Sequence, residues 1–312
     1  ETAEMVWNMM AAFAGYGFPK AHAASYARVA WQAAWCKSHF PAEFMASVLA
    51  NGGGYYSQRV YLSEVRRMGI KVKPPHINHS NHRFTVRYPQ GDPILYMGLD
   101  QVHGLTQQTQ KRIIEERPFN SLNDFLTRVD PRKAEIENLI QCGGLDGLGS
   151  IRSMLENIQS GSWKKDQFSL FDWQESSQSD DWSLVERSQA QEQILGISVD
   201  VHPLELVSNQ IKEHQVIPSS ETESYLGKSI IVAGLKVSSH RARTTKGDLM
   251  MFMSMEDLEG MLEVVFFPKI YQQYRFILRQ PGPFLVRGIV EQDDTQENVW
   301  IRAEKVKLLE SE

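Results

Sequence analysis

The chain has 312 residues, of which 42% are hydrophobic and 23% charged, and this composition is typical of a globular protein with two or three domains. Its two cysteines stand far apart and no apolar run approaches the ~20 residues of a membrane span, which argues against a disulfide framework, a cysteine-rich zinc site and a transmembrane helix. The net charge of −5 is unevenly spread, since residues 1–90 carry 10 Lys and Arg against 4 Asp and Glu, whereas residues 166–227 carry 2 against 12. We therefore expect the basic region to bind nucleic acid and the acidic region to repel it.

Residues 1–50 are expected to be helical, and the most informative run within them extends from Phe13 to Leu49. A Gly-Tyr-Gly turn precedes a long alanine-rich helix, and Pro41 separates this helix from a second one. Lys20 and His22 lie at the start of the first helix, where unpaired backbone N–H groups also point, so this pair favours an anion such as a phosphate. We take Lys20 and His22 as candidate nucleotide-binding residues, and the alternative is a purely structural helix start.

Residues 58–68 are expected to be helical and residues 70–88 extended. Within the extended part, His76, His79 and His82 recur at a spacing of three. Imidazole is a common zinc ligand, but neither a His-x-x-x-His spacing nor a carboxylate pair accompanies these residues. We therefore predict a structural turn here and no metal site.

Residues 99–117 resemble a helix-hairpin-helix motif, because two short helical patterns flank a tight turn. That motif binds the duplex backbone without reading bases, since hairpin N–H groups and the following helix N-terminus face a phosphate. The usual Gly-x-Gly is Gly104-Leu105-Thr106 here, which predicts a looser approach of the backbone. A more degenerate copy over residues 136–155, with its turn at residues 142–145, carries less basic charge and is expected to be structural. The predicted DNA contacts of the first copy are His103, Gly104, Leu105 and Thr106.

Residues 160–190 are rich in Ser, Gln and Asp, which predicts a flexible linker. An apolar island inside this linker needs a partner surface, because it cannot bury itself locally. Its sequence, Gln-Phe-Ser-Leu-Phe, resembles the pentapeptide with which bacterial proteins engage the beta sliding clamp. The alternative is a segment that folds back on the following domain. The predicted clamp-binding residues are Gln167, Ser169, Leu170 and Phe171.

From residue 228 onward the pattern changes to five strand candidates, with a helix at residues 268–280 between the third and the fourth. This is the order of an OB-fold, a small barrel that often binds single strands. The first connecting loop carries Arg241, Arg243 and Lys246, which we predict to contact single-stranded DNA, although such a loop can also be merely solvated. Phe252 and Trp300 are candidate stacking aromatics or, equally well, core residues.

Taken together, these segments resemble the C-terminal part of the bacterial DNA polymerase III alpha subunit, a C-family DNA polymerase. The strings GYGFPKAHAASYA and HFPAEFM match the end of that family's fingers region, with Pro19 in place of the usual Asn and Ala21 in place of Ser. The NGGGYYS loop is nearer to the error-prone members. The resemblance implies a multidomain α plus β chain, divided into the end of the fingers (1–90), a tandem helix-hairpin-helix region (91–160), a linker with the clamp peptide and a helix (161–227), and a five-stranded OB-fold barrel (228–312).

The resemblance also implies template-directed DNA synthesis in the full chain. The palm carboxylates that hold two Mg²⁺ ions have no counterpart here and are expected before Glu1, so this part should be inactive alone and bind no cofactor itself. The implied partners are primer-template DNA, single-stranded DNA, the sliding clamp and other holoenzyme subunits, in the cytoplasm and not at a membrane. Two alternatives are a non-enzymatic DNA-binding adaptor with helix-hairpin-helix and OB modules, and a tRNA-binding OB protein.

Overall fold

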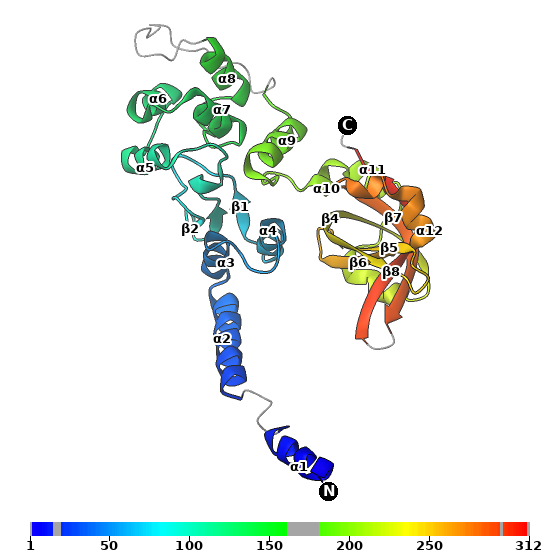
Figure 1. Ribbon diagram of the computed structural model, residues 1–312. Coiled ribbons are helices and arrows are strands. Elements are labelled where there is room, and N and C mark those ends of the chain that lie inside the picture. Colours follow the sequence, from blue (N-terminus) through cyan, green and yellow to red (C-terminus); the bar gives the residue numbers. More distant parts are fainter. Residues whose placement is uncertain (1, 15–19, 161–180, 294–295, 311–312) are drawn as a thin grey trace.

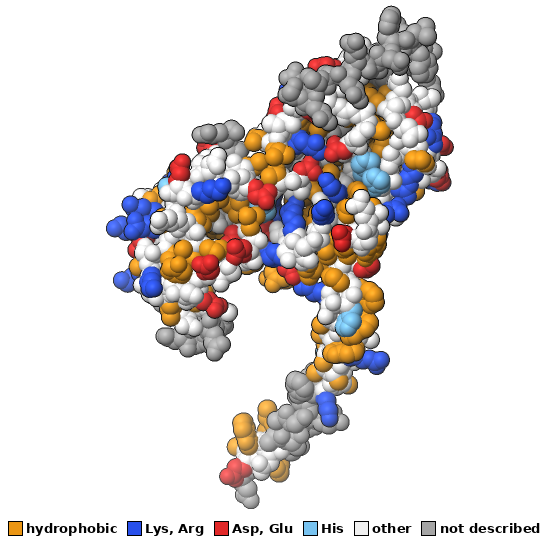
Figure 2. Space-filling model, turned by 180° about the vertical axis from the view of Figure 1, so that it is seen from behind, with side chains coloured by type: hydrophobic (Ala, Val, Ile, Leu, Met, Phe, Trp, Pro, Cys, Tyr) orange, Lys and Arg blue, Asp and Glu red, His pale blue; other side chains and the backbone are white. Residues whose placement is uncertain are grey.

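The computed structural model describes residues 2–14, 20–160, 181–293 and 296–310. Figure 1 shows a helical body, a barrel beside it and a helical extension that leaves the body. The extension consists of α1 (Thr2–Ala14) and α2 (Lys20–His39). Every residue of α2 is exposed or half-buried, including Tyr26, Trp31 and Trp35. Figure 2 shows hydrophobic side chains along this extension.

The helical body is built from six helices and a small sheet around one core. Its sheet has the order β1-β3-β2, in which β1 pairs parallel with β3 and β2 pairs antiparallel with it. The elements are α3 (Pro41–Ala50), α4 (Gln58–Arg67), β1 (Lys71–Lys73), β2 (Thr85–Arg87), β3 (Ile94–Tyr96), a 3₁₀ turn η1 (Leu99–Gln101), α5 (Gln107–Glu116), α6 (Leu122–Val129), α7 (Lys133–Gln141) and α8 (Ile151–Ser160).

The sequence analysis expected a domain boundary at residue 90, but the structure continues across this position as one unit. Lys71 pairs with Ile94 across that boundary, and one cluster of buried side chains includes Leu62, Leu95 and Phe125. A domain requires its own hydrophobic core. The predicted fingers end and hairpin region therefore share a single structural unit from α3 onward.

The segment after residue 181 also belongs largely to folded structure. Helix α9 (Leu184–Leu195) packs on the body, where Ile194 and Val199 join the same core. Arg59 Nη2 lies 2.8 Å from Glu192 Oε1. The short helices α10 (Pro203–Leu206) and α11 (Ser208–Lys212) and the 3₁₀ segment η3 (Ser219–Tyr225) lead to the barrel, against which Leu204 is buried. The described part of the predicted linker thus connects the two units through packed helices.

The C-terminal unit is a closed five-stranded barrel, which confirms the predicted OB-fold order. The strands follow the cycle β4-β5-β6-β8-β7, with β4 hydrogen-bonded to both β5 and β7 and a parallel pair between β6 and β8. Along β5 the side chains alternate, since Met251, Met253 and Met255 are buried and Phe252 is half-exposed. The elements are β4 (Ser229–Arg243), β5 (Leu249–Glu256), β6 (Met261–Phe266), α12 (Pro268–Tyr274), η4 (Ile277–Arg279), β7 (Phe284–Asp293) and β8 (Gln296–Leu308).

Among the helices that the structure describes, none combines the length and the apolar surface that crossing a membrane requires.

Candidate nucleic-acid interface

The first hairpin connects η1 to α5 and presents His103 and Gly104 at the surface. Gly104 has a φ of 77°, in the left-handed region that favours glycine, which allows the chain to reverse tightly here. Thr106 caps α5, because its hydroxyl accepts a hydrogen bond from the backbone N–H of Thr109. The local sequence therefore folds as predicted, into a turn followed by a capped helix.

The buried carboxylate of Glu135, on α7, occupies the position at the start of α5 where an anion would bind. Its Oε1 accepts hydrogen bonds from Thr106 N at 2.9 Å, Thr106 Oγ1 at 2.7 Å and Thr109 Oγ1 at 2.9 Å. Its Oε2 accepts one from Arg132 N at 2.8 Å. Burial by itself would raise the pKa of Glu135, but the hydrogen bonds from Arg132, Thr106 and Thr109 outweigh it and lower the pKa.

This carboxylate changes what the first hairpin can offer to DNA. The N–H of Thr106 is already bound to Glu135, that of Leu105 donates to Val102 O, and that of His103 donates to Ile194 O at 3.1 Å. The Leu105 side chain is part of the core. Of the predicted contacts, Leu105 and Thr106 are thus engaged within the protein, and the surface that DNA can reach is the His103 ring and Gly104.

The second hairpin, between α7 and α8, contains a Gly-x-Gly that the sequence analysis missed. Gly147 and Gly149 flank Leu148 directly before α8, and both have positive φ values, of 89° and 154°. The signal was present as Gly-Leu-Gly-Ser before the helix, and it directly follows the predicted turn at residues 142–145, which the structure confirms with a positive φ of 89° at Gly143. The N-terminus of α8 also receives a carboxylate, because Arg152 N donates to Asp181 Oδ1 at 3.2 Å.

The barrel presents cations beside an aromatic pair. Arg241, Arg243 and Lys246 are exposed at the β4–β5 turn, and Arg243 Nη1 donates to Gly247 O at 3.0 Å. His240 and Phe252 are opposite each other on β4 and β5, and their rings stack with centroids 4.8 Å apart at an interplanar angle of 4°. An exposed ring surface next to cations is the combination that single-strand binding proteins use.

The structure decides how the two candidate aromatics lie. Phe252 stands on the outward side of β5, between the inward Met251 and Met253, so it is not a barrel-core residue. Trp300 is half-exposed on β8, with its ring centroid 6.3 Å from that of Phe267. His240 was missed, because its neighbour across the strands depends on a register that one strand alone does not reveal.

The remaining predicted residues lie outside this surface. Lys20 and His22 are exposed on the first turns of α2, and the His22 ring contacts that of Tyr26 edge-on at 4.4 Å. The turn at residues 15–17 and the clamp peptide from Gln167 to Phe171 lie outside the described residues, so both predictions remain predictions.

The three histidines of the extended segment make contacts within the helical body. The Nδ1 of His76 accepts a hydrogen bond from Asn78 N at 3.0 Å, and His82 Nδ1 lies 2.6 Å from Gln110 Oε1. His79 packs its ring against that of His76, with the centroids 4.5 Å apart. Across the described ranges of the chain, no three His, Cys, Asp or Glu side chains gather closely enough to hold a metal ion.

Comparison with protein families gives one match in the helical body. A family described as a helix-hairpin-helix motif matches residues 69–155. This range begins before β1 and ends in α8, so it includes both hairpins and the small sheet that joins them to α4.

Among solved structures, a domain of replication protein A from Methanococcus maripaludis aligns with 31% of this chain and 91% of its own, at 12% identity and a TM-score of 0.24. That likeness is too weak to carry an argument.

Curated relatives align along nearly the whole chain. It is 30% identical over 296 residues to an error-prone DNA polymerase of Corynebacterium efficiens, which covers 93% of this chain and 27% of the relative. It is 32% identical over 336 residues to a DNA polymerase III subunit alpha of Xylella fastidiosa, which covers 94% of this chain and 28% of the relative. The chain thus spans less than a third of the length of these relatives.

Proposed function

Because the chain belongs, along nearly all of its length, to the family of bacterial DNA polymerase III alpha subunits and error-prone DNA polymerases, we propose that it is a DNA-binding portion of such a polymerase. The observation that carries this proposal is the similarity over 93% of the chain, through both the helical body and the barrel. The polymerase as a whole copies a template strand and works with the sliding clamp and other holoenzyme subunits.

Metal-assisted nucleotidyl transfer is proposed for the whole polymerase and not for this chain. Two Mg²⁺ ions in such a reaction need several carboxylate ligands at one place. Within the part of the chain that the structure describes, the acidic side chains do not form such a group. The role proposed for the residues of this chain is the binding and positioning of DNA.

The proposed DNA-binding surface has two parts with different roles. His103 and Gly104 meet the duplex backbone at the first hairpin, where contacts hold the DNA without reading its sequence. The barrel face with Arg241, Arg243 and Lys246 meets a single strand, whose bases stack on the ring pair of His240 and Phe252. The cations attract the phosphates, and the exposed rings can stack with any of the bases.

Neutralising the barrel turn is expected to weaken single-strand binding. In the triple variant Arg241→Gln, Arg243→Gln, Lys246→Gln, the affinity for an oligothymidylate should fall by about 10-fold or more at low salt, because up to three phosphate contacts are lost. The slope of log affinity against log salt concentration should become shallower by roughly 2–3. Fluorescence anisotropy across a salt series measures both quantities.

A matched control removes three charges elsewhere on the barrel, with Lys269→Gln, Lys305→Gln and Lys307→Gln, all exposed and outside the β4–β5 turn. If both triple variants weaken binding equally, the turn has no special role. In a separate experiment, the 312-residue chain is given a primed template with Mg²⁺ and deoxynucleotides. Detectable primer extension would contradict the proposal that this chain binds DNA without catalysing its synthesis.

The peptide at residues 167–171 is proposed to bind the sliding clamp. Replacing both apolar residues, as Leu170→Ala and Phe171→Ala, should reduce affinity for the clamp by about 100-fold, because such a peptide binds through a few buried side chains. Isothermal titration against the purified clamp measures the change. Replacing the nearby Trp173 with Ala serves as the control, since it lies outside the motif. Unchanged affinity in the double variant would refute the assignment.

A further inference from the structure

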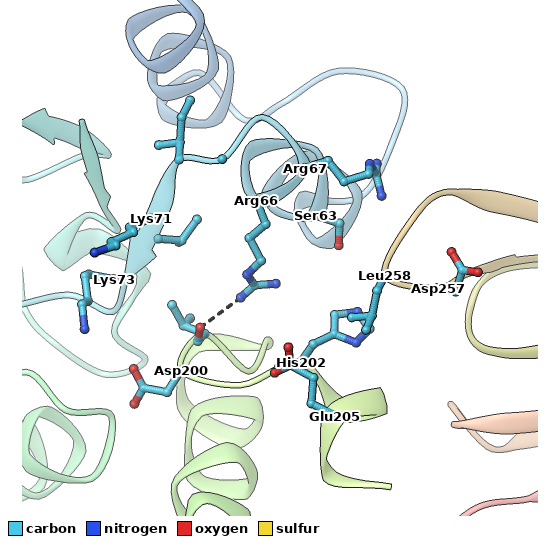
Figure 3. Close-up of a pocket in the computed structure, with 14 residues that line it drawn as sticks. Ser63, Arg66, Arg67, Lys71, Lys73, Asp200, His202, Glu205, Asp257 and Leu258 are labelled. Carbon is cyan, nitrogen blue, oxygen red and sulfur yellow. Dashed lines mark hydrogen bonds between the residues drawn. The ribbon is translucent and has the colours of Figure 1, made fainter. Parts of the chain in front are cut away.

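A cavity of about 540 Å³ lies where the helical body meets the segment before the barrel and the turn between β5 and β6. Its walls come from α4, β1, residues 199–205 and Asp257–Leu258, as Figure 3 shows. Apolar side chains form part of the lining, at Ile70, Val72, Val199 and Leu258. The volume falls in the range of small-molecule sites, which is about 300–1,000 Å³.

Two hydrogen-bond donors in this cavity have no partner among the described residues. The Nδ1 of His202 accepts a hydrogen bond from Leu204 N at 3.3 Å, so the ring proton resides on Nε2. That Nε2–H is buried and unsatisfied, as is the Nη1 of Arg67, whose Nε and Nη2 donate to Glu64 Oε2. His202 is 6% exposed. Buried donors without acceptors are costly, so a ligand that supplies acceptors would be favoured here.

The charged groups of the lining leave an excess of free cations. Asp200 is bound to Arg187 at 2.8 Å, Glu205 accepts from His202 N at 3.0 Å, and Asp257 accepts from the N–H groups of Ser219, Glu259 and Gly260. Arg66 Nη2 donates to Ser198 O and Val199 O, and Arg67 Nη2 lies 3.1 Å from Glu64 Oε2. By contrast, Lys71 and Lys73 are exposed at the edge and have no ion-pair partner within the described residues.

One further carboxylate lies near the site, beside Ser63. Glu256, at the end of β5, is fully buried, and burial raises its pKa against the opposing influence of the Arg59 charge, a hydrogen bond from Ser63 and the Arg67 charge. The rise favours the neutral acid, which carries an O–H donor in place of a negative charge. Glu256 therefore opposes an anion in the cavity less than an ordinary carboxylate would.

We propose that this cavity binds a nucleotide, with its phosphate at Arg67 and His202 and its nucleoside against the apolar wall. Phosphate oxygens accept hydrogen bonds only, which matches a site whose unsatisfied lining groups are donors. Lys73 and Lys71 add positive charge at the mouth. The nucleotide is either free or part of a strand, because both carry the same phosphate. This inference does not depend on the proposed DNA-binding surface, which lies on other elements.

Binding of dAMP to the 312-residue chain tests this site. We expect a dissociation constant of about 1 mM or tighter by isothermal titration. Lys73→Gln should weaken binding by about 10-fold, because it removes one of the two positive charges at the mouth of the cavity. The control Lys305→Gln removes a charge of the same kind outside the cavity. In ¹H–¹⁵N spectra, the His202 Nε2 resonance should shift as dAMP is added.

The proposal is overturned if dAMP does not bind at ~10 mM. It is equally overturned if Lys73→Gln and Lys305→Gln weaken binding alike, or if the His202 resonance stays in place at saturation. An oligothymidylate identifies the source of the nucleotide. If it displaces dAMP, and does so more weakly in Lys73→Gln, the site holds a nucleotide of a strand. If it leaves dAMP bound, the site holds a free nucleotide. The Arg241, Arg243 and Lys246 variants should leave dAMP binding unchanged, so the two proposals fail separately.

Discussion

Glu135→Ala is expected to lower the free energy of unfolding by about 3 kcal/mol or more, because it leaves buried donors of two segments without an acceptor. The carboxylate accepts four hydrogen bonds, from Arg132 N, from Thr106 N and Oγ1, and from Thr109 Oγ1. The variant loses the cap of α7 and the link between α7 and the start of α5 in one step. Urea denaturation followed by circular dichroism measures the change.

Two further variants separate the role of this carboxylate from a general effect of acidic residues. Glu137→Ala, two residues along the same helix, removes a surface ion pair with Lys133 and should cost about 0.5 kcal/mol or less. Glu135→Gln keeps an acceptor oxygen but removes the charge beside the hairpin, so DNA phosphates should bind more tightly to it than to the parent chain. Equal stability of Glu135→Ala and Glu137→Ala would contradict the structural role of Glu135.

Acid is expected to destabilise the folded chain through His202. Burial, together with the neighbouring charges of Arg66 and Arg59, lowers the pKa of His202 from 6.5 to about 4. Between these two pH values the unfolded chain binds more protons than the folded chain, so stability falls as the pH falls. The stabilisation is complete above pH 6.5 and is lost towards pH 4, by about 3 kcal/mol. Urea denaturation at a series of pH values measures this loss.

The variant His202→Asn isolates this contribution. Asparagine can cap α10 through its side-chain oxygen but does not titrate in this range. Burial also lowers the pKa of His76 and of His79, and these residues act equally in both proteins. The difference in stability between parent and variant should therefore shrink steadily from pH 7 to pH 4. A pH-independent difference would show that His202 stabilises the fold by packing alone.

The barrel was predictable from sequence because strands and turns leave local patterns. The side chains of β5 alternate between core and surface with a period of two, and the helical string that starts at Pro268 interrupts the strands at the predicted place. The first hairpin was predictable for the same reason, since Gly104 indicates a turn and the Thr106 cap indicates the start of a helix. The turn at residues 142–145 was predicted correctly, but the Gly-x-Gly that follows it before α8 was equally visible and was overlooked.

The boundary near residue 90 could not be predicted, because composition changes there while packing does not. The pair formed by Lys71 and Ile94 depends on a parallel register between strands separated by a long connection. The sequence therefore separated two segments that bury their side chains against each other. The same reason accounts for α9, which appeared to be part of a linker and packs its Ile194 into the helical core.

The amino-acid sequence by itself determined the element order, the hairpin before α5, the five barrel strands and the resemblance to a polymerase family. These features depend on residues that are close together along the chain. Only the tertiary structure decided which groups meet. It placed the Glu135 carboxylate on the hairpin, stacked His240 on Phe252 and brought Ser63 and His202 to one cavity. These residues are distant in the chain, and their approach follows from packing and strand register, which no local pattern encodes.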